Sequence, residues 1–133
     1  KWENDYLKRL KQISLKIHEL KHFDSKERND QQVIQKAKQI TGKQSPDLIL
    51  LDERGKTFTS DKFSTWVFDQ LESISSLCFV IGGAEGHGEA IKKIAKYSIR
   101  LSDFTLPHRL ARTIIVEQVY RAETLHLGHP YHK

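Results

Sequence analysis

The last residues of the chain could exchange a proton and bind an anion. His129-Pro130-Tyr131-His132-Lys133 directly follows a helical segment that contains Arg121. Imidazoles accept protons near neutral pH, and basic side chains bind phosphate. The alternative is a solvated tail without a role, because chain ends are usually frayed. Residue types alone leave both interpretations open.

A glycine-rich segment, Gly82-Gly83-Ala84-Glu85-Gly86-His87-Gly88, follows a short apolar run. It lacks the G-x-G-x-x-G spacing of a dinucleotide-binding loop and the Gly-Lys-Ser/Thr of a P-loop. Glycines still allow a ligand to approach the backbone closely. A ligand-binding loop and an ordinary tight turn therefore both remain possible at this stage.

Metal chemistry and nucleophilic catalysis are disfavoured. His126, His129 and His132 are spaced three apart, but Gly128 and Pro130 break the helix that would bring their rings together. The single cysteine, Cys78, lies inside an apolar run and is expected in the core. The sequence has no G-x-S-x-G elbow for serine chemistry. We expect no metal site.

Helix and strand periods alternate along the chain. The expected strands are 13–19, 48–51, 77–81 and 98–101, and the expected helices lie around 2–11, 33–40, 63–74, 91–96 and 107–127. This alternation is typical of βαβ units, so we expect an α/β fold with a mostly parallel sheet flanked by helices.

Local signals refine these elements. We expect Asp24 to cap the second helix, and Thr59 or Ser60 to cap the third. Residues 52–56 are expected to form a turn. Ile94 and Leu110 are expected to face the core from their helices, and glycines at 42 and 128 to end theirs.

The ends of the expected strands direct attention to three places. Ligands of parallel sheets bind outside the carboxyl ends of the strands. The segments at these ends are Leu51-Asp52, Gly82-Gly83 and the loop 101–106. We therefore expect a binding site where these three segments meet.

Size and charge favour a single domain with a polyanionic partner. The chain has 133 residues and a net charge of +5. Residues 1–43 have a net charge of +5, residues 44–86 of −4 and residues 87–133 of +4. Such basic regions suggest a polyanion, although an ordinary solvated face is an equally open interpretation of charge alone. RNA is favoured over a membrane, because no strongly amphipathic basic helix is present in the sequence pattern. The single cysteine fits a reducing compartment. Since the sequence contains no Met, we expect the natural chain to begin before Lys1.

Several motifs together resemble one known family. They are Ile81-Gly82-Gly83-Ala84-Glu85-Gly86, Leu101-Ser102-Asp103-Phe104-Thr105-Leu106-Pro107-His108, Arg112, Val116-Glu117-Gln118-Val119-Tyr120-Arg121-Ala122 and the terminal run 129–133. From about Tyr6 onward the chain resembles the RlmH family, SPOUT-class methyltransferases that act on N3 of a pseudouridine in 23S ribosomal RNA.

The resemblance implies one SPOUT domain over residues 1–133, with a C-terminal trefoil knot, S-adenosylmethionine as cofactor and a homodimeric state. It implies cytoplasmic action on large-subunit ribosomal RNA, which we expect to be in the assembled ribosome. The cofactor contacts carried over are Leu51, Gly82, Leu101, Ser102, Asp103, Phe104, Thr105 and Leu106. Two departures stand out: the opening strand of the family is absent, and His87-Gly88 replaces the usual Leu-x.

The catalytic candidates come from the chemistry of the residues. His129 or His132, with Tyr131, would accept the N3 proton, and Arg121 would bind a phosphate or stabilise the anionic imide. Two alternatives remain: a non-catalytic RNA-binding SPOUT-like module, and another enzyme that binds a nucleotide at the glycine loop. Binding of S-adenosylmethionine would separate the first of these from the methyltransferase.

Overall fold

A three-stranded parallel sheet forms the centre of the molecule. The computed structural model describes residues 2–83 and 86–131. The strands lie in the order β2-β1-β3, where β1 is Leu48–Thr57, β2 is Cys78–Ile81 and β3 is Tyr97–Arg100. The described residues also form the helices α1 (Trp2–Arg9), α2 (Lys26–Thr41), α3 (Ser60–Ser73), α4 (Glu89–Ile94) and α5 (His108–Leu127). The predicted α/β class with a parallel sheet and flanking helices is confirmed.

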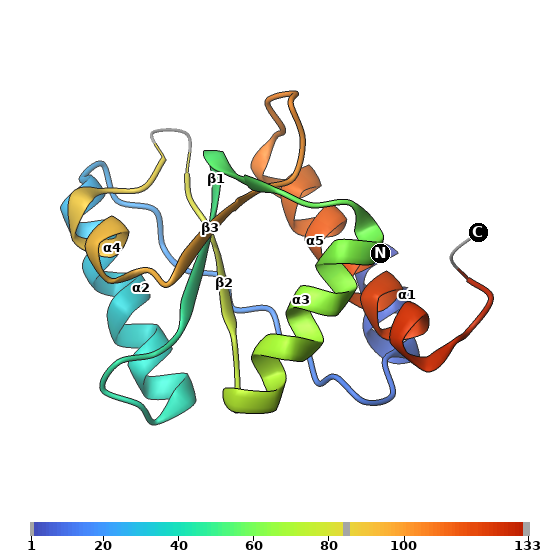
Figure 1. Ribbon diagram of the computed structural model, residues 1–133. Coiled ribbons are helices and arrows are strands. Elements are labelled where there is room, and N and C mark those ends of the chain that lie inside the picture. Colours follow the sequence, from blue (N-terminus) through green and yellow to red (C-terminus); the bar gives the residue numbers. More distant parts are fainter. Residues whose placement is uncertain (1, 84–85, 132–133) are drawn as a thin grey trace.

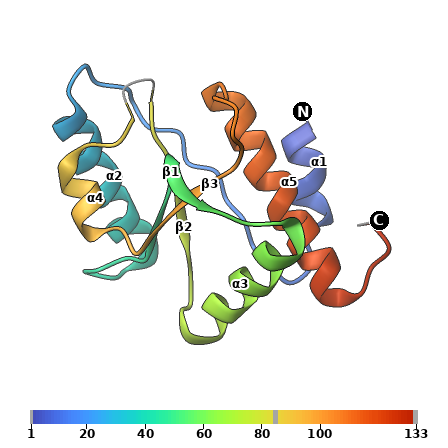
Figure 2. The same ribbon diagram turned by 45° about the horizontal axis from the view of Figure 1, so that its top comes forward.

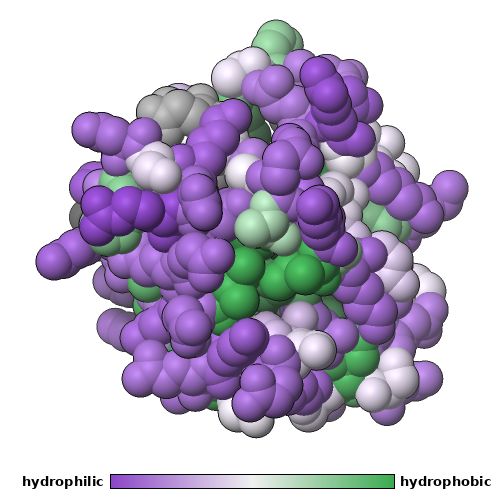
Figure 3. Space-filling model, turned by 90° about the vertical axis from the view of Figure 1, so that its left-hand side faces the viewer, coloured by the Kyte–Doolittle hydropathy of each residue, from purple (hydrophilic) through white to green (hydrophobic). Residues whose placement is uncertain are grey.

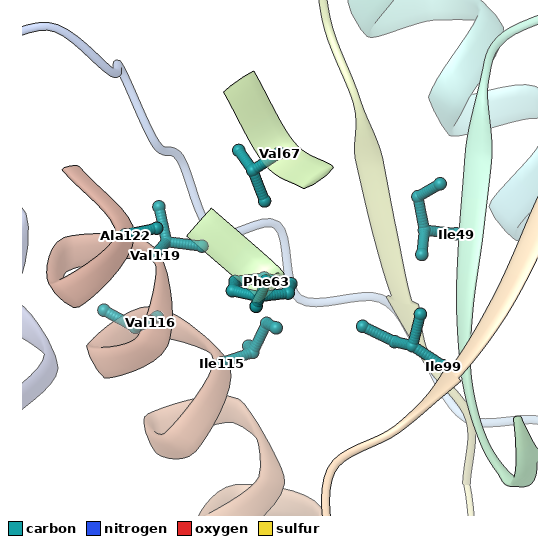
Figure 4. Close-up of a cluster of buried hydrophobic side chains, with 8 residues drawn as sticks. All are labelled: Ile49, Phe63, Val67, Ile99, Ile115, Val116, Val119 and Ala122. Atoms are coloured by element: carbon teal, nitrogen blue, oxygen red, sulfur yellow. The ribbon is translucent and has the colours of Figure 1, made fainter. Parts of the chain in front are cut away.

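The helices cover both faces of the sheet (Figures 1 and 2). α2 and α4 lie on one face, α3 and α5 lie on the other, and α1 packs against α5. The pleat of β1 serves both layers, because successive side chains point to opposite faces. Ile49 joins the α3/α5 core, which Figure 4 shows, while Leu48 and Leu50 join the core under α2 and α4.

The helix boundaries follow local chemistry. Thr59 caps α3, and its hydroxyl accepts a hydrogen bond from the Lys62 amide. Gly42 and Gly128 end α2 and α5 in the left-handed region, with φ of 69° and 72°. These three predictions are confirmed. The predicted cap of α2 is wrong, because Ser25 rather than Asp24 accepts the hydrogen bond from the first turn.

The strand predicted at 13–19 is wrong. Residues 10–25 form neither helix nor strand, although Ile13, Leu15 and Ile17 pack against the α3/α5 core as their alternation suggested. Side chains hold this extended segment instead of a neighbouring strand. The buried carboxylate of Glu123 accepts hydrogen bonds from the amides of residues 11–13.

The turn predicted at 52–56 is also wrong, because β1 continues through it to Thr57. Its pairing with β3 shifts register between Leu51 and Lys56, and Ile99 is opposite both. Gly55 makes this possible: a Cβ there would lie 2.5 Å from the carbonyl carbon of Ile99. The two backbones therefore meet closely beside the end of β3.

Two side chains predicted to face the core are exposed. Ile94 is 49% exposed and Leu110 is 46% exposed, while Ile91 and Ala111 are buried. Figure 3 views the side of the molecule with α2 and α4, where hydrophilic residues surround a small apolar patch. The six-residue helix α4 buries Ile91, so its last residue Ile94 reaches solvent. In the first turn of α5, Ala111 rather than Leu110 takes the buried position.

Candidate functional site

The carboxyl ends of the strands bring the predicted cofactor residues to one edge of the sheet. Leu51 of β1 is in register with Ile81 of β2 and with Ile99 of β3. Gly82 follows β2 directly, and residues 101–106 follow β3. In Figure 1 the segments after β2 and β3 lie at the same end of the sheet. We call Leu51, Gly82, His87, His108 and residues 101–106 the strand-end site.

Two imidazoles bind backbone carbonyls within the strand-end site. His87 Nε2 lies 3.0 Å from the carbonyl oxygen of Leu51, so the ring N–H donates to it. His108, the first residue of α5, donates in the same way from Nδ1 to the carbonyl of Gly82, at 3.1 Å. The glycine loop is thus fixed both to β1 and to α5.

The loop 101–106 is tied to its neighbours but presents an open face. Asp103 pairs with Arg100 at 3.1 Å, and the Thr105 hydroxyl donates to Glu53 at 3.2 Å. Phe104 is 82% exposed. The loop therefore presents an aromatic side chain to solvent beyond the end of β3.

The residues of the strand-end site fit the adenosyl part of the predicted cofactor. Small-molecule sites are mostly apolar with a few directed polar groups, and here Leu51, Leu101, Phe104 and Leu106 accompany backbone groups. Gly82 is required locally, because a Cβ there would lie 3.1 Å from the His87 ring and 3.2 Å from the backbone of Gly86. The position can therefore hold no larger residue without movement.

Two hollows on the surface lie away from this site. One, of about 540 Å³, is lined by Leu20 and by residues of α2. The other, of about 430 Å³, lies between α3 and α5 and includes Asp61, Asp69, Glu72 and His126. None of the predicted cofactor and catalytic residues that the structure describes lines either one.

Arg121 and Tyr131, two of the predicted catalytic residues, meet through Glu117. Glu117 Oε2 accepts hydrogen bonds from Arg121 Nη2 at 2.8 Å and from the Tyr131 hydroxyl at 2.9 Å. The Arg121 guanidinium also lies over the Tyr131 ring, 4.9 Å from its centroid. The phenol oxygens of Tyr131 and Tyr6 are 3.4 Å apart. We call Glu117, Arg121, Tyr131 and Tyr6 the tail cluster.

The charges of the tail cluster set its protonation. Hydrogen bonds donated to Glu117 raise the pKa of the Arg121 guanidinium, which stays a cation. Burial, with hydrogen bonding to Tyr6 and Glu117, raises the pKa of the Tyr131 phenol well above its usual range. Near neutral pH the Tyr131 phenol therefore stays protonated and donates a hydrogen bond, so it cannot act as the base that removes a proton.

Of the two histidines predicted as catalytic in the tail, the structure describes His129. His129 is exposed, and its Nδ1 accepts a hydrogen bond from the Tyr131 amide at 3.2 Å. The neutral ring then has its proton on Nε2. His132 lies outside the described residues. His126 stacks on Phe68, with centroids 3.7 Å apart, so it takes no part in the tail cluster.

The strand-end site and the tail cluster do not meet within one chain. His108 begins α5, and Glu117 and Arg121 come nine and thirteen positions later. At the α-helical rise these positions are about 14 and 20 Å further along the axis. Figures 1 and 2 show the described end of the chain on the opposite side of the molecule from the loop after β2.

Sequence reasoning missed four members of these sites, namely His87, His108, Glu117 and Tyr6. Glu117 and Arg121 are four positions apart on a helix, a spacing that predicts an ion pair, so this contact could have been found. No local signal links His87 to Leu51, which are 36 residues apart. Among the described residues, no helix is long and apolar enough to cross a bilayer. No three described His, Cys, Asp or Glu residues are grouped to hold a metal ion.

Comparison with known protein families identifies the family of this chain. Residues 1–132 match the family model described as "Predicted SPOUT methyltransferase". The chain belongs to the SPOUT methyltransferase family. The resemblance read from the motifs is confirmed, and the trefoil knot of SPOUT proteins stays a prediction for this chain.

Curated relatives of this SPOUT chain have one name in common, "Ribosomal RNA large subunit methyltransferase H". The protein of Deinococcus radiodurans is 46% identical over 87 residues, which cover 65% of this chain and 60% of that protein. The protein of Gemmatimonas aurantiaca is 43% identical over 86 residues, covering 65% and 56%. The protein of Prochlorococcus marinus is 38% identical over 128 residues, covering 96% and 81%. The chain thus spans under two thirds of the first two relatives.

Proposed function

We propose that this protein transfers a methyl group from S-adenosylmethionine to N3 of a pseudouridine in 23S ribosomal RNA. It would act as a homodimer of single-domain subunits, in the cytoplasm, on the large subunit of the assembled ribosome. The observation that carries this proposal is the convergence of Leu51, Gly82 and residues 101–106 at one edge of a parallel sheet in a SPOUT chain. The names of the relatives supply the substrate class.

In this proposal the strand-end site holds the cofactor. S-adenosylmethionine supplies an electrophilic methyl group on a positively charged sulfur. The chain contributes orientation: backbone groups of Gly82 and residues 101–106, with the apolar side chains of Leu51 and Phe104, bind the adenosyl part. Holding the reactants in line lowers the barrier by several kcal/mol through orientation alone.

The tail would manage the proton on N3 of the base. Because Tyr131 stays protonated near neutral pH, the proton acceptor falls to an imidazole, His129 or His132. His129 would have to release the amide of Tyr131 from Nδ1 before that atom could accept a proton. Arg121, a cation held by Glu117, would bind a phosphate or stabilise the imide anion.

A dimer would bring the two halves of the site together. The tail cluster begins about 14 Å along α5 from the strand-end site, too far for one chain to hold a methyl donor and deprotonate its acceptor. In an isologous pair, a surface of one subunit meets the matching surface of the other. We propose that α5 lies at or near the interface and that each tail completes the partner's strand-end site.

RNA recognition would use the surface of the dimer. The net charge of +5 gives attraction to phosphates, which is weakened by salt. Without a separate RNA-binding domain in residues 1–133, substrate shape is the expected cue, since folded RNA is read largely through shape and backbone.

The decisive experiment is methyl transfer to ribosomes that lack the modification. The protein is incubated with methyl-labelled S-adenosylmethionine and 70S ribosomes, and the labelled nucleotide is mapped. We expect label at N3 of one pseudouridine in 23S rRNA. Cofactor binding without transfer to any ribosomal particle would refute the proposal, and RNA binding without cofactor binding would support the non-catalytic module.

A further inference from the structure

His87 lies between two residues of the strand-end site that come from different strands. Its Nε2–H donates to the carbonyl of Leu51, at 3.0 Å, at the point where the pairing of β1 with β3 breaks register. The neighbouring Cε1–Nδ1 edge of the ring faces Gly82: a Cβ on that glycine would lie 3.1 Å from Cε1 and 3.2 Å from Nδ1 of His87. One imidazole thus spans the ends of β1 and β2.

The ring is built into the fold. His87 is only 7% exposed. The loop around it is fixed on both sides: the Gly86 amide donates to the Gly83 carbonyl at 3.0 Å, and the amides of Gly88 and Ile91 donate to the buried carboxylate of Asp30. A polar ring buried to this degree is expected to have a hydrogen-bond partner. Here the partner is the carbonyl of Leu51, a backbone group of the strand-end site.

We propose that His87 is a positioning residue for the methyl donor. It holds the Leu51 carbonyl and the Gly82 backbone at a fixed separation, so that the adenosyl part of the donor meets a preorganised edge of the sheet. This inference rests on the proposed function. His87 is absent from the cofactor contacts expected from the sequence, and it stands where a leucine is usual in RlmH-like proteins.

Preorganisation predicts a specific energetic signature. Removing the imidazole N–H takes this hydrogen bond from the partly buried Leu51 carbonyl and frees the glycine loop, so ligand binding must then order both. We expect the affinity for S-adenosylmethionine to fall by about 10-fold or more when the imidazole N–H is lost. Affinity should recover when another N–H donor of similar reach replaces the ring.

Three substitutions test this signature in the full chain. His87→Leu preserves side-chain size but removes the N–H, His87→Gln retains an N–H donor, and His18→Leu is a control at an exposed histidine. The ligand is S-adenosylhomocysteine, which binds without turnover, and the measurement is isothermal titration calorimetry. We expect parental affinity for His18→Leu, a value within about 3-fold for His87→Gln, and the loss for His87→Leu.

A measurement on the parent protein covers the case in which His87→Leu does not fold. With ¹⁵N-labelled histidine, the Nε2–H signal of His87 should shift on addition of S-adenosylhomocysteine and exchange with water more slowly. Disappearance of this N–H signal in the complex would mean that the ligand displaces the ring from Leu51, and would overturn the proposal.

The outcomes separate the two levels of inference. If the parent binds S-adenosylhomocysteine and a folded His87→Leu variant binds equally well, His87 has no positioning role and the proposed function stands. If His87→Gln is as weak as His87→Leu, the hydrogen bond is not the cause and the proposal is wrong. If the parent itself does not bind this ligand, the proposed function fails and the inference fails with it.

Discussion

The hydroxyl of Tyr131 donates a hydrogen bond to Oε2 of Glu117, 2.9 Å away, and this bond holds the C-terminal tail on α5. The same carboxylate binds Arg121, so a single side chain orients both a phenol and a guanidinium. Tyr131 also packs edge-on against Tyr120, with centroids 4.8 Å apart. The first turn of the tail is therefore ordered by contacts with the chain's own last helix.

Replacing Tyr131 by Phe should impair methyl transfer more than stability. Phe preserves the ring that packs on Tyr120 and lies under Arg121 but loses the bond to Glu117. We expect the free energy of unfolding to fall by about 0.5–1.5 kcal/mol. Steady-state kinetics should show kcat/KM reduced about 10-fold or more, because the tail loses its orientation. Tyr97→Phe, at a partly exposed tyrosine outside the tail cluster, is the control and should leave kcat/KM unchanged.

Deleting residues 129–133 should abolish transfer and leave most of the fold intact. The tail follows the end of α5 at Gly128, and the cores consist of residues before it. Loss of a general base lowers rates by about 100-fold or more. Circular dichroism and urea unfolding should show a folded protein with slightly reduced stability. A truncated protein that methylates ribosomes at the parental rate would refute the assignment of the catalytic residues to the tail.

Much of the fold could be predicted because its signals are local. The run Leu48–Leu51 is apolar on both faces, as a central parallel strand requires, and glycines at 42 and 128 stop their helices. The strand at 13–19 could not be predicted correctly, since alternation identifies an extended, half-buried segment and says nothing of a pairing partner. The continuation of β1 depends on a contact between Gly55 and Ile99 that only the tertiary structure reveals.

Part of the candidate site could be predicted from the sequence, and part depends on the tertiary structure. The rule that ligands bind at the carboxyl ends of parallel strands, together with the family resemblance, predicted that Leu51 and Gly82 belong to one binding site. The hydrogen bond from His87 to Leu51 joins residues that are far apart in the sequence. No hydrophobic periodicity could reveal such a contact. The separation of the tail cluster from the strand-end site follows from the length and course of α5, which residue types alone do not give.

An ion pair between α1 and α5 predicts a loss of stability in acid. Arg112 donates to both oxygens of Glu3, at 2.7 and 3.0 Å, and these bonds lower the pKa of that carboxyl. A carboxyl with a lowered folded-state pKa contributes stability above its unfolded pKa and loses the contribution as the pH falls through its folded pKa. Glu3→Gln should therefore reduce the free energy of unfolding by about 1–2 kcal/mol at pH 7, and the difference should shrink as the pH falls below the unfolded pKa of the carboxyl.

Urea unfolding of both proteins at several pH values would check this dependence. Glu19→Gln is the comparison, because Arg112 also binds Glu19 but that carboxylate is exposed to solvent. Solvent screening should make its effect smaller. A destabilisation by Glu3→Gln that is the same at pH 3 and pH 7 would show that packing of the side chain, and not its charge, is responsible.

Mixed dimers would test whether each active site combines two subunits. Gly82→Val forces a branched side chain against the His87 ring and the Gly86 backbone, so it should disable the strand-end site. Arg121→Ala removes the cation of the tail cluster. Each variant alone should be inactive, and their folding is checked by circular dichroism.

When the two proteins are refolded together, half of the dimers pair one variant with the other. If the tail of one subunit serves the strand-end site of its partner, each mixed dimer has one site with both halves intact, and activity should return to about a quarter of the parental value. If both halves come from the same chain, neither site of a mixed dimer is complete. The mixture would then be as inactive as its components, and that result would overturn the proposed exchange of tails.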